Sequence, residues 1–140
     1  MKAQRQISAA EAMEPYRHLV EGALRYAAET YSYEDVVNAV QAGEMFFWPA
    51  DESFLITEVA QFPRKRTLHV FLAGGKLSEI KAMDESIVAY AEILECDAIS
   101  LSGRAGWEKA LGDLGYKKIH TTLGKNINGH RNTELRPRSG

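Results

Sequence analysis

The sequence has little of what marks several common classes of protein. It contains 1 Cys, which excludes an internal disulfide framework and fits a reducing compartment. No apolar stretch approaches the roughly 20 residues that span a bilayer, and the first ten residues (MKAQRQISAA) lack the apolar core of a signal peptide. The formal net charge is −2, so we expect no electrostatic bias toward nucleic acid or membranes. These absences predict a cytoplasmic protein.

Metal ligands are also scarce. The 4 His and the single Cys stand at no spacing that is typical of a metal site, so we expect none. What is present is ordinary for a globular protein: 45% hydrophobic and 26% charged residues over 140 positions. That length allows one domain with one sizeable core, and it is too short for two.

The first 43 residues predict a short strand and two helices. The stretch SAAE has the pattern of a capping box, and apolar residues then recur with helical period as far as Tyr31. Pro15 lies inside that stretch, which favours a later start for the helix. Ser32 and Asp35 indicate a second cap. We therefore expect a strand over 4–7, a helix between 8 and 31, and a second helix from 32 that ends at Gly43.

The middle of the chain changes to a two-residue period. Three runs rich in aromatic and β-branched residues, 44–50, 53–62 and 67–73, are separated by short polar connectors and predict an antiparallel meander. After Gly74 and Gly75 the helical period returns. The remaining expected elements are a helix over 76–94, a strand over 98–102, a helix over 106–115 and a last strand over 116–123. A strand–helix–strand unit places two strands parallel, so we expect an α/β (α+β) fold: a mixed sheet with helices on both faces.

This order of elements resembles the GNAT superfamily of acyl-CoA N-acyltransferases. Two local patterns carry the resemblance: VFLAGGKLSEI (70–80), a strand that enters a glycine turn and a helix, and GRAGWEKALGDLGYKKI (103–119), which is similar to the closing helix and next strand of the family. The chain also resembles small GNAT-like proteins of bacteriophages. We divide it into a GNAT-like domain over 1–124 and a polar, basic tail over 125–140.

The resemblance implies a cofactor site at the glycine turn. Successive N–H groups in such a turn, with the positive end of the next helix, attract a pyrophosphate. In the GNAT family that pyrophosphate belongs to acetyl-CoA, whose pantetheine lies between two splayed parallel strands. The corresponding residues here are Leu72, Ala73, Gly74, Gly75 and Lys76, with Arg104 as a further cation after the strand over 98–102. The alternative is that the two glycines only supply the backbone conformation of a strand–helix corner.

The resemblance also implies a base and an acid for acyl transfer. The first candidate for the base is Glu58, which alternation places on one face of its strand with Ile56, and the second is His69. The other interpretation is structural: a paired or edge-exposed Glu58, and a His69 that hydrogen-bonds locally. Two departures from the family pattern weaken the catalytic interpretation. Val70 stands where the family has Arg or Gln, and Leu111 stands where the family has its acid tyrosine.

Three functions follow from these observations. The first is an N-acetyltransferase that uses acetyl-CoA and an amine acceptor that the sequence does not name. The second is a GNAT-like assembly component of a bacteriophage particle that has lost catalysis, with the tail over 125–140 contacting protein partners or other copies of the chain. Its location would be the host cytoplasm or the virion. The third is an acyl-CoA sensor that binds the cofactor without turnover.

Overall fold

The computed structural model describes residues 7–27, 30–103 and 106–127. Its elements run in the order α1 (Ala9–Met13), η1 (Glu14–Tyr16), α2 (Arg17–Leu24), α3 (Tyr33–Gln41), β1 (Phe46–Pro49), β2 (Phe54–Phe62), β3 (Lys65–Gly74), α4 (Leu77–Ala82), α5 (Asp84–Ile93), β4 (Ala98–Leu101), α6 (Gly106–Ala110) and η2 (Gly112–Leu114). The sheet has the order β1-β2-β3-β4. The first three strands are antiparallel neighbours, and β3 and β4 are parallel, which confirms the expected meander and parallel pair.

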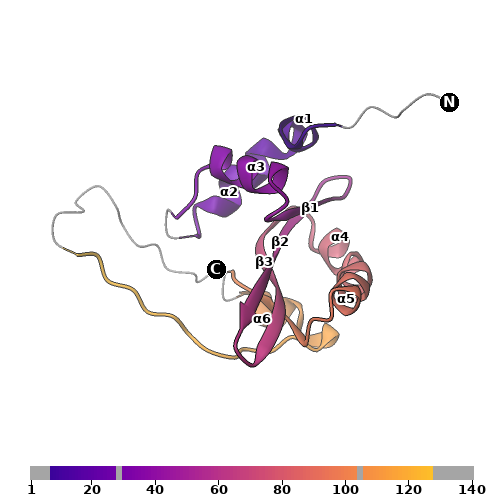
Figure 1. Ribbon diagram of the computed structural model, residues 1–140, viewed down its shortest axis with the longest axis vertical. Coiled ribbons are helices and arrows are strands. Elements are labelled where there is room, and N and C mark those ends of the chain that lie inside the picture. Colours follow the sequence, from indigo (N-terminus) through magenta and orange to yellow (C-terminus); the bar gives the residue numbers. More distant parts are fainter. Residues whose placement is uncertain (1–6, 28–29, 104–105, 128–140) are drawn as a thin grey trace.

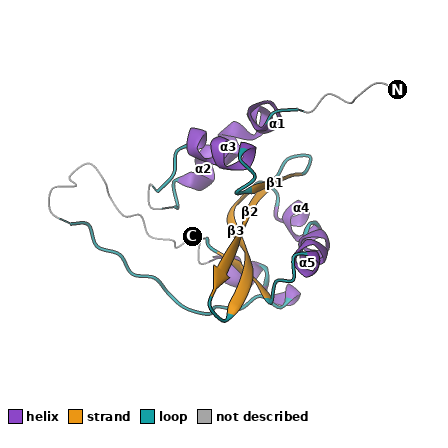
Figure 2. Ribbon diagram, viewed as in Figure 1, coloured by secondary structure: helices purple, strands orange, loops and turns teal. Residues whose placement is uncertain are grey.

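Helices cover both faces of this sheet (Figure 1, Figure 2). One core lies between the sheet and α1–α3, and Phe54, Ile56 and Leu72 are its buried strand residues. A second core lies between the sheet and α4–α5, with Leu55, Leu68 and Val70 from the strands. The two cores alternate along β2, as the two-residue period predicts. The expected α+β architecture is confirmed.

The N-terminal helical region is divided where the sequence predicted one long helix. Ser8 and Glu11 form the expected capping box, so the first helix begins where its cap predicts. Pro15 does not delay that start. It produces the 3₁₀ turn η1 because it has no N–H to donate, and α2 then ends at Leu24 rather than near residue 31. The second capping box, Ser32 with Asp35, is present at α3, and Gly43 follows that helix with φ of 79°.

The expected helix over 76–94 is also divided, at Met83, where no proline or glycine marks a break. The expected helix over 106–115 continues only to Ala110, and a 3₁₀ turn starts at Gly112, a residue that weakens a helix. Gly115 stops this region with φ of 95°, as predicted. The expected strand over 4–7 lies almost wholly outside the described residues, and its last residue, Ile7, is not in a strand.

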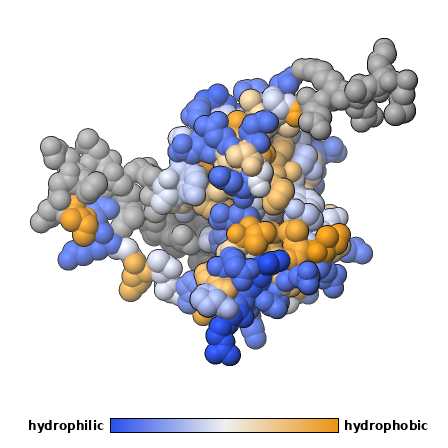
Figure 3. All heavy atoms as spheres, viewed as in Figure 1, coloured by the Kyte–Doolittle hydropathy of each residue, from blue (hydrophilic) through white to orange (hydrophobic). Residues whose placement is uncertain are grey.

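The predicted strand over 116–123 is wrong. Residues 116–127 have neither helix nor strand, and Figure 1 shows them leaving the sheet as an extended segment. Apolar side chains stand out along this segment (Figure 3), and Ile119 and Leu123 are 71% and 89% exposed. No strand of the described residues pairs with this segment. Extended backbone without a paired neighbour gains no ladder of hydrogen bonds.

Candidate functional site

The glycine turn joins β3 to α4 and is packed tightly against the β1–β2 connection. Gly75 has φ of 111°, in the region that favours glycine. A Cβ added there would collide with the carbonyl oxygen of Glu52 and would lie 2.5 Å from the Cα of Ser53. The second glycine of the pair is therefore required by the corner itself, whatever the turn binds.

Hydrogen bonds within the chain already engage this turn. The N–H of Lys76 donates to the Oγ of Ser53 at 2.8 Å, and the Ser53 hydroxyl donates to the Oε1 of Glu79 at 2.6 Å. The N–H of Glu52 donates to the same oxygen at 2.9 Å. These hydrogen bonds, the one from Ser53 first, lower the pKa of Glu79 and so favour its charged form. A carboxylate therefore occupies the first turn of α4, where a phosphate would otherwise be attracted.

The predicted cofactor residues are divided between two places. Leu72 and Ala73 lie at the end of β3, while Gly74 and Gly75 form the corner. The Nζ of Lys76 lies 3.0 Å from the Oε1 of Glu52, so its charge is paired with a carboxylate on the surface. Arg104 lies outside the described residues.

The two parallel strands separate before β3 ends. Ile56 pairs with Leu72 and Thr57 pairs with Val70, so Phe71 is an extra residue on β3. A bulge of this kind bends its strand. Pairing with β4 stops at Val70 and Leu101, followed by one bond from the N–H of Ser102 to the Val70 carbonyl at 3.2 Å. This is the place where the GNAT resemblance expects a cofactor to enter between strands.

A hollow of about 130 Å³ lies at this separation. Its walls are residues 71–73 of β3, residues 102–103 after β4, Trp107 of α6, and Ala23, Tyr26, Ala27 and Thr30 at the end of α2 and after it. Most of this lining is apolar or small, and three side chains, Tyr26, Thr30 and Ser102, bring hydroxyl groups. The Thr30 hydroxyl donates to the Ala27 carbonyl at 2.7 Å. Gly103 is needed beside it, because a Cβ at that position would collide with the Trp107 ring. Leu111, which replaces the family tyrosine, is 3% exposed and does not line the hollow.

The predicted base candidates are brought together by the strand register. Glu58 on β2 is the cross-strand partner of His69 on β3, and His69 is the partner of Ser100 on β4. The three residues form one row across the sheet. His69 is bonded through both ring nitrogens: Nδ1 lies 2.7 Å from the Oγ of Ser100, and Nε2 lies 2.9 Å from the Oγ of Ser102. Ser102 therefore connects this row to the hollow.

Glu58 is half-buried, and this burial raises the pKa of its carboxyl group. A carboxylate with a raised pKa is a better proton acceptor at neutral pH. The sequence predicted Glu58 and His69 as separate candidates. It did not predict Ser100, Ser102 or Tyr26. The alternate serines of AISLS were visible in the sequence, but no local pattern places them against His69.

Glu58→Gln is expected to stabilise the protein at pH 7 by less than about 1 kcal/mol, because the burial penalty on the charged carboxylate disappears. A raised folded pKa means that the wild type loses stability as pH rises from the unfolded value of 4.5 through the folded value. The extra stability of Glu58→Gln over the wild type should therefore vanish below pH 4.5. Urea unfolding of both proteins at pH 4 and pH 7 measures this. A variant less stable than the wild type at pH 7 would show that the carboxylate has a stabilising partner.

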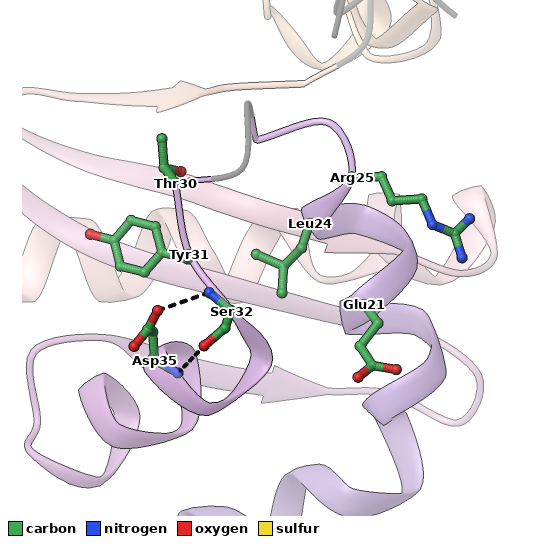
Figure 4. Close-up of a pocket in the computed structure, with 7 residues that line it drawn as sticks. All are labelled: Glu21, Leu24, Arg25, Thr30, Tyr31, Ser32 and Asp35. Carbon is green, nitrogen blue, oxygen red and sulfur yellow. Dashed lines mark hydrogen bonds between the residues drawn. The ribbon is translucent and has the colours of Figure 1, made fainter. Parts of the chain in front are cut away.

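A larger depression of about 500 Å³ lies between the end of α2 and the start of α3, and Figure 4 shows its lining. Several of its polar groups bond within the chain and hold the two helices. The N–H of Ser32 donates to Asp35 at 2.9 Å, and the N–H of Asp35 donates to the Ser32 hydroxyl at 3.1 Å. Glu21 pairs with Arg17. The smaller hollow is the better candidate site, because it lies beside the His69 row.

No protein-family model matches the chain, and no curated protein matches it. Solved structures do. A probable acetyltransferase superposes with a TM-score of 0.59 at 10% identity, covering 91% of this chain and 97% of its own. The protein TTHA1254 of Thermus thermophilus gives 0.55 at 18% identity, with 91% and 98% covered. A transcriptional regulator from Bacillus halodurans gives 0.53 at 14%, with 89% and 97% covered. At these identities the likeness shows the fold: the chain is a mixed α+β domain of GNAT-like fold.

Proposed function

We propose that the protein binds an acyl-CoA thioester in the hollow between β3 and β4 and transfers the acyl group to an amine. One observation carries the proposal: the hollow lies where the parallel strands separate, and its wall holds a hydroxyl bonded to His69. The apolar lining suits the acyl and pantetheine chain, because burial of apolar surface drives such binding.

Two groups then supply proton transfer. The amine loses a proton when it attacks the thioester, and His69 accepts it through Ser102, with Glu58 as its neighbour in the next strand. The leaving thiolate needs a proton, and Tyr26 provides the phenol that lines the hollow. Tyr26 thus takes the role that Leu111 does not fill.

In this proposal the pyrophosphate of the ligand contributes less to the binding free energy than the acyl and pantetheine chain does. The N–H of Lys76, one donor of the turn, already bonds to Ser53, whose hydroxyl donates to Glu79. A pyrophosphate therefore gains little there unless these bonds break. We therefore expect acetyl-CoA and S-acetylpantetheine, which lacks the pyrophosphate, to bind with affinities within about tenfold of each other, a difference of about 1.4 kcal/mol.

Isothermal calorimetry with both ligands tests this function. Ala23→Phe, which fills the hollow from α2, should weaken both ligands by more than about tenfold, because little free volume is left. Ala89→Phe on the exposed face of α5 is the matched control and should bind as the wild type does. Absence of heat with either ligand at millimolar concentration, or unaltered binding by Ala23→Phe, would overturn the proposal.

Calorimetry together with an acetyl-transfer assay on a panel of primary amines separates the two alternatives. Binding without acetyl transfer to any primary amine would favour a sensor. A failure to bind either ligand would favour a non-catalytic assembly component, as in a bacteriophage particle, and the internally bonded glycine turn is the feature that supports that role.

A further inference from the structure

His69 is held between Ser100 of β4 and Ser102, the residue that follows the end of β4. Ser100 and Ser102 are two residues apart, and both side chains reach the His69 ring. Their hydroxyl oxygens lie 2.7 Å and 2.9 Å from the two ring nitrogens of His69. A histidine bonded on Nδ1 by one group and on Nε2 by a serine hydroxyl has the geometry of a base oriented toward a nucleophile.

The hydroxyl on the Nε2 side is the one with access to a ligand. Ser102 lines the hollow, together with Phe71 and Ala73 across the gap and Trp107 beside it. Ser100 lies two residues earlier, where β4 is still paired with β3. Ser102 therefore stands between the imidazole and the space that we assign to the thioester.

We propose that Ser102 is a nucleophile that accepts the acyl group before the amine does, so that transfer proceeds through an acyl-serine ester. This inference rests on the function proposed above for the same hollow. It requires the tautomer with the proton on Nδ1, where it donates to the Ser100 hydroxyl. Nε2 is then the acceptor for the hydroxyl of Ser102.

Both steps use only Ser102, His69 and the two substrates. In the first, the Oγ of Ser102 attacks the thioester carbonyl carbon as its proton moves to Nε2 of His69. The C–S bond then breaks, and the leaving sulfur takes that proton from Nε2, in place of the proton that direct transfer to the amine would take from Tyr26. CoA leaves as a thiol and an ester remains on Ser102. In the second, the amine attacks the ester carbonyl carbon and Nε2 takes a proton from the nitrogen. The C–O bond breaks and the proton returns to Ser102.

A neutral serine in the third position has a physical consequence. Ser100 fixes the ring without adding a negative charge, so it stabilises the imidazolium less than a carboxylate would. Glu58 is the cross-strand partner of His69 on its other side and is the nearest acid in the row. In a Ser-His-Asp triad one aspartate both orients the histidine and supplies a negative charge. In this row Ser100 orients the ring and Glu58 supplies the charge.

The experiment is acid-quenched intact mass and peptide mapping after incubation with acetyl-CoA and, separately, with p-nitrophenyl acetate. We expect one added acetyl group on Ser102 and none in Ser102→Ala. His69→Gln keeps a hydrogen-bonding side chain without the base and should slow acylation by about 100-fold or more. Ser100→Ala should slow it as well, and Ser100→Thr should restore it, which a merely space-filling serine would not require. Ser86→Ala, on the exposed face of α5, is the matched control.

Release of free thiol from acetyl-CoA is the second measurement, for an ester that reacts too fast to accumulate. Ser102→Ala should abolish this release while calorimetry still detects acetyl-CoA. If acetyl-CoA binds but neither reagent labels Ser102 and Ser102→Ala releases thiol at the wild-type rate, the nucleophile is excluded and the acyl-CoA function stands. If p-nitrophenyl acetate labels Ser102 but acetyl-CoA does not bind, the nucleophile stands and the acyl-CoA function is excluded.

Discussion

Gly75→Ala is expected to destabilise the protein by about 2–6 kcal/mol, because two penalties act at one position. The backbone of Gly75 has φ of 111°, and holding a residue with a Cβ in such a conformation costs about 1–3 kcal/mol. The Cβ would also collide with the backbone of Glu52 and Ser53, which cannot turn away as a flexible side chain can. Forcing atoms into a packed region costs about 1–3 kcal/mol more. Urea unfolding followed by circular dichroism measures the change.

Gly43→Ala is the matched control. Gly43 also has a positive φ, 79°, but nothing lies within 4 Å of an added Cβ there. Only the backbone penalty applies, so we expect a loss of about 1 kcal/mol. Equal losses in the two variants would contradict the close packing of the glycine turn against the β1–β2 connection.

Because Gly75 is needed for the corner itself, substitutions at this position cannot test whether the glycine turn binds an anion. A bulky or acidic residue at position 75 should remove acetyl-CoA binding simply because it disrupts the corner. Such a result would say nothing about a pyrophosphate. The ratio of acetyl-CoA to S-acetylpantetheine affinity reports on the turn without altering it. A large ratio would mean that the ligand displaces the bonds that Ser53 makes to Lys76 and Glu79.

Local patterns predicted most elements of the fold. The two capping boxes, at Ser8 and Ser32, depend on residues three apart, and both are present. Alternation along β2 also sorted Leu55 and Ile56 into the two cores. The strand over 116–123 failed because a local residue pattern describes one segment, whereas pairing needs a second strand at the right edge. Nothing local reports whether that edge is available.

The site depended on information that no local pattern contains. Glu58 and His69 were each predicted, but 11 positions separate them and only the β2–β3 register makes them partners. The bulge at Phe71 shifts the register beyond that pair, at the residue where pairing with β4 has stopped, and no glycine marks it. Ser102 is a candidate only because of residues distant in sequence: it is hydrogen-bonded to His69 and it lines the hollow.

Phe54→Ala is the second large effect that we expect, a loss of about 3–5 kcal/mol. The Phe54 side chain is fully buried in the core under α1–α3, and Phe54 pairs with Gly74. Its ring covers that glycine closely: a Cβ on Gly74 would lie 2.8 Å from the Cε1 of Phe54. Truncation leaves a cavity beside the glycine turn that rigid strands on both sides cannot fill.

Phe62→Ala, at the far end of the same strand, is the matched control. Phe62 is 53% exposed, so the same truncation there removes less buried surface and should cost less than about 1 kcal/mol. Phe54→Leu keeps most of the apolar volume, and its loss of stability should fall between those of the two alanine variants.

The cavity at Phe54 also removes support from Leu72, which belongs to the same core and lines the hollow. We therefore expect Phe54→Leu to weaken S-acetylpantetheine binding while Phe62→Ala leaves it unchanged. Equal losses of stability in Phe54→Ala and Phe62→Ala would contradict the central place of Phe54 in this core.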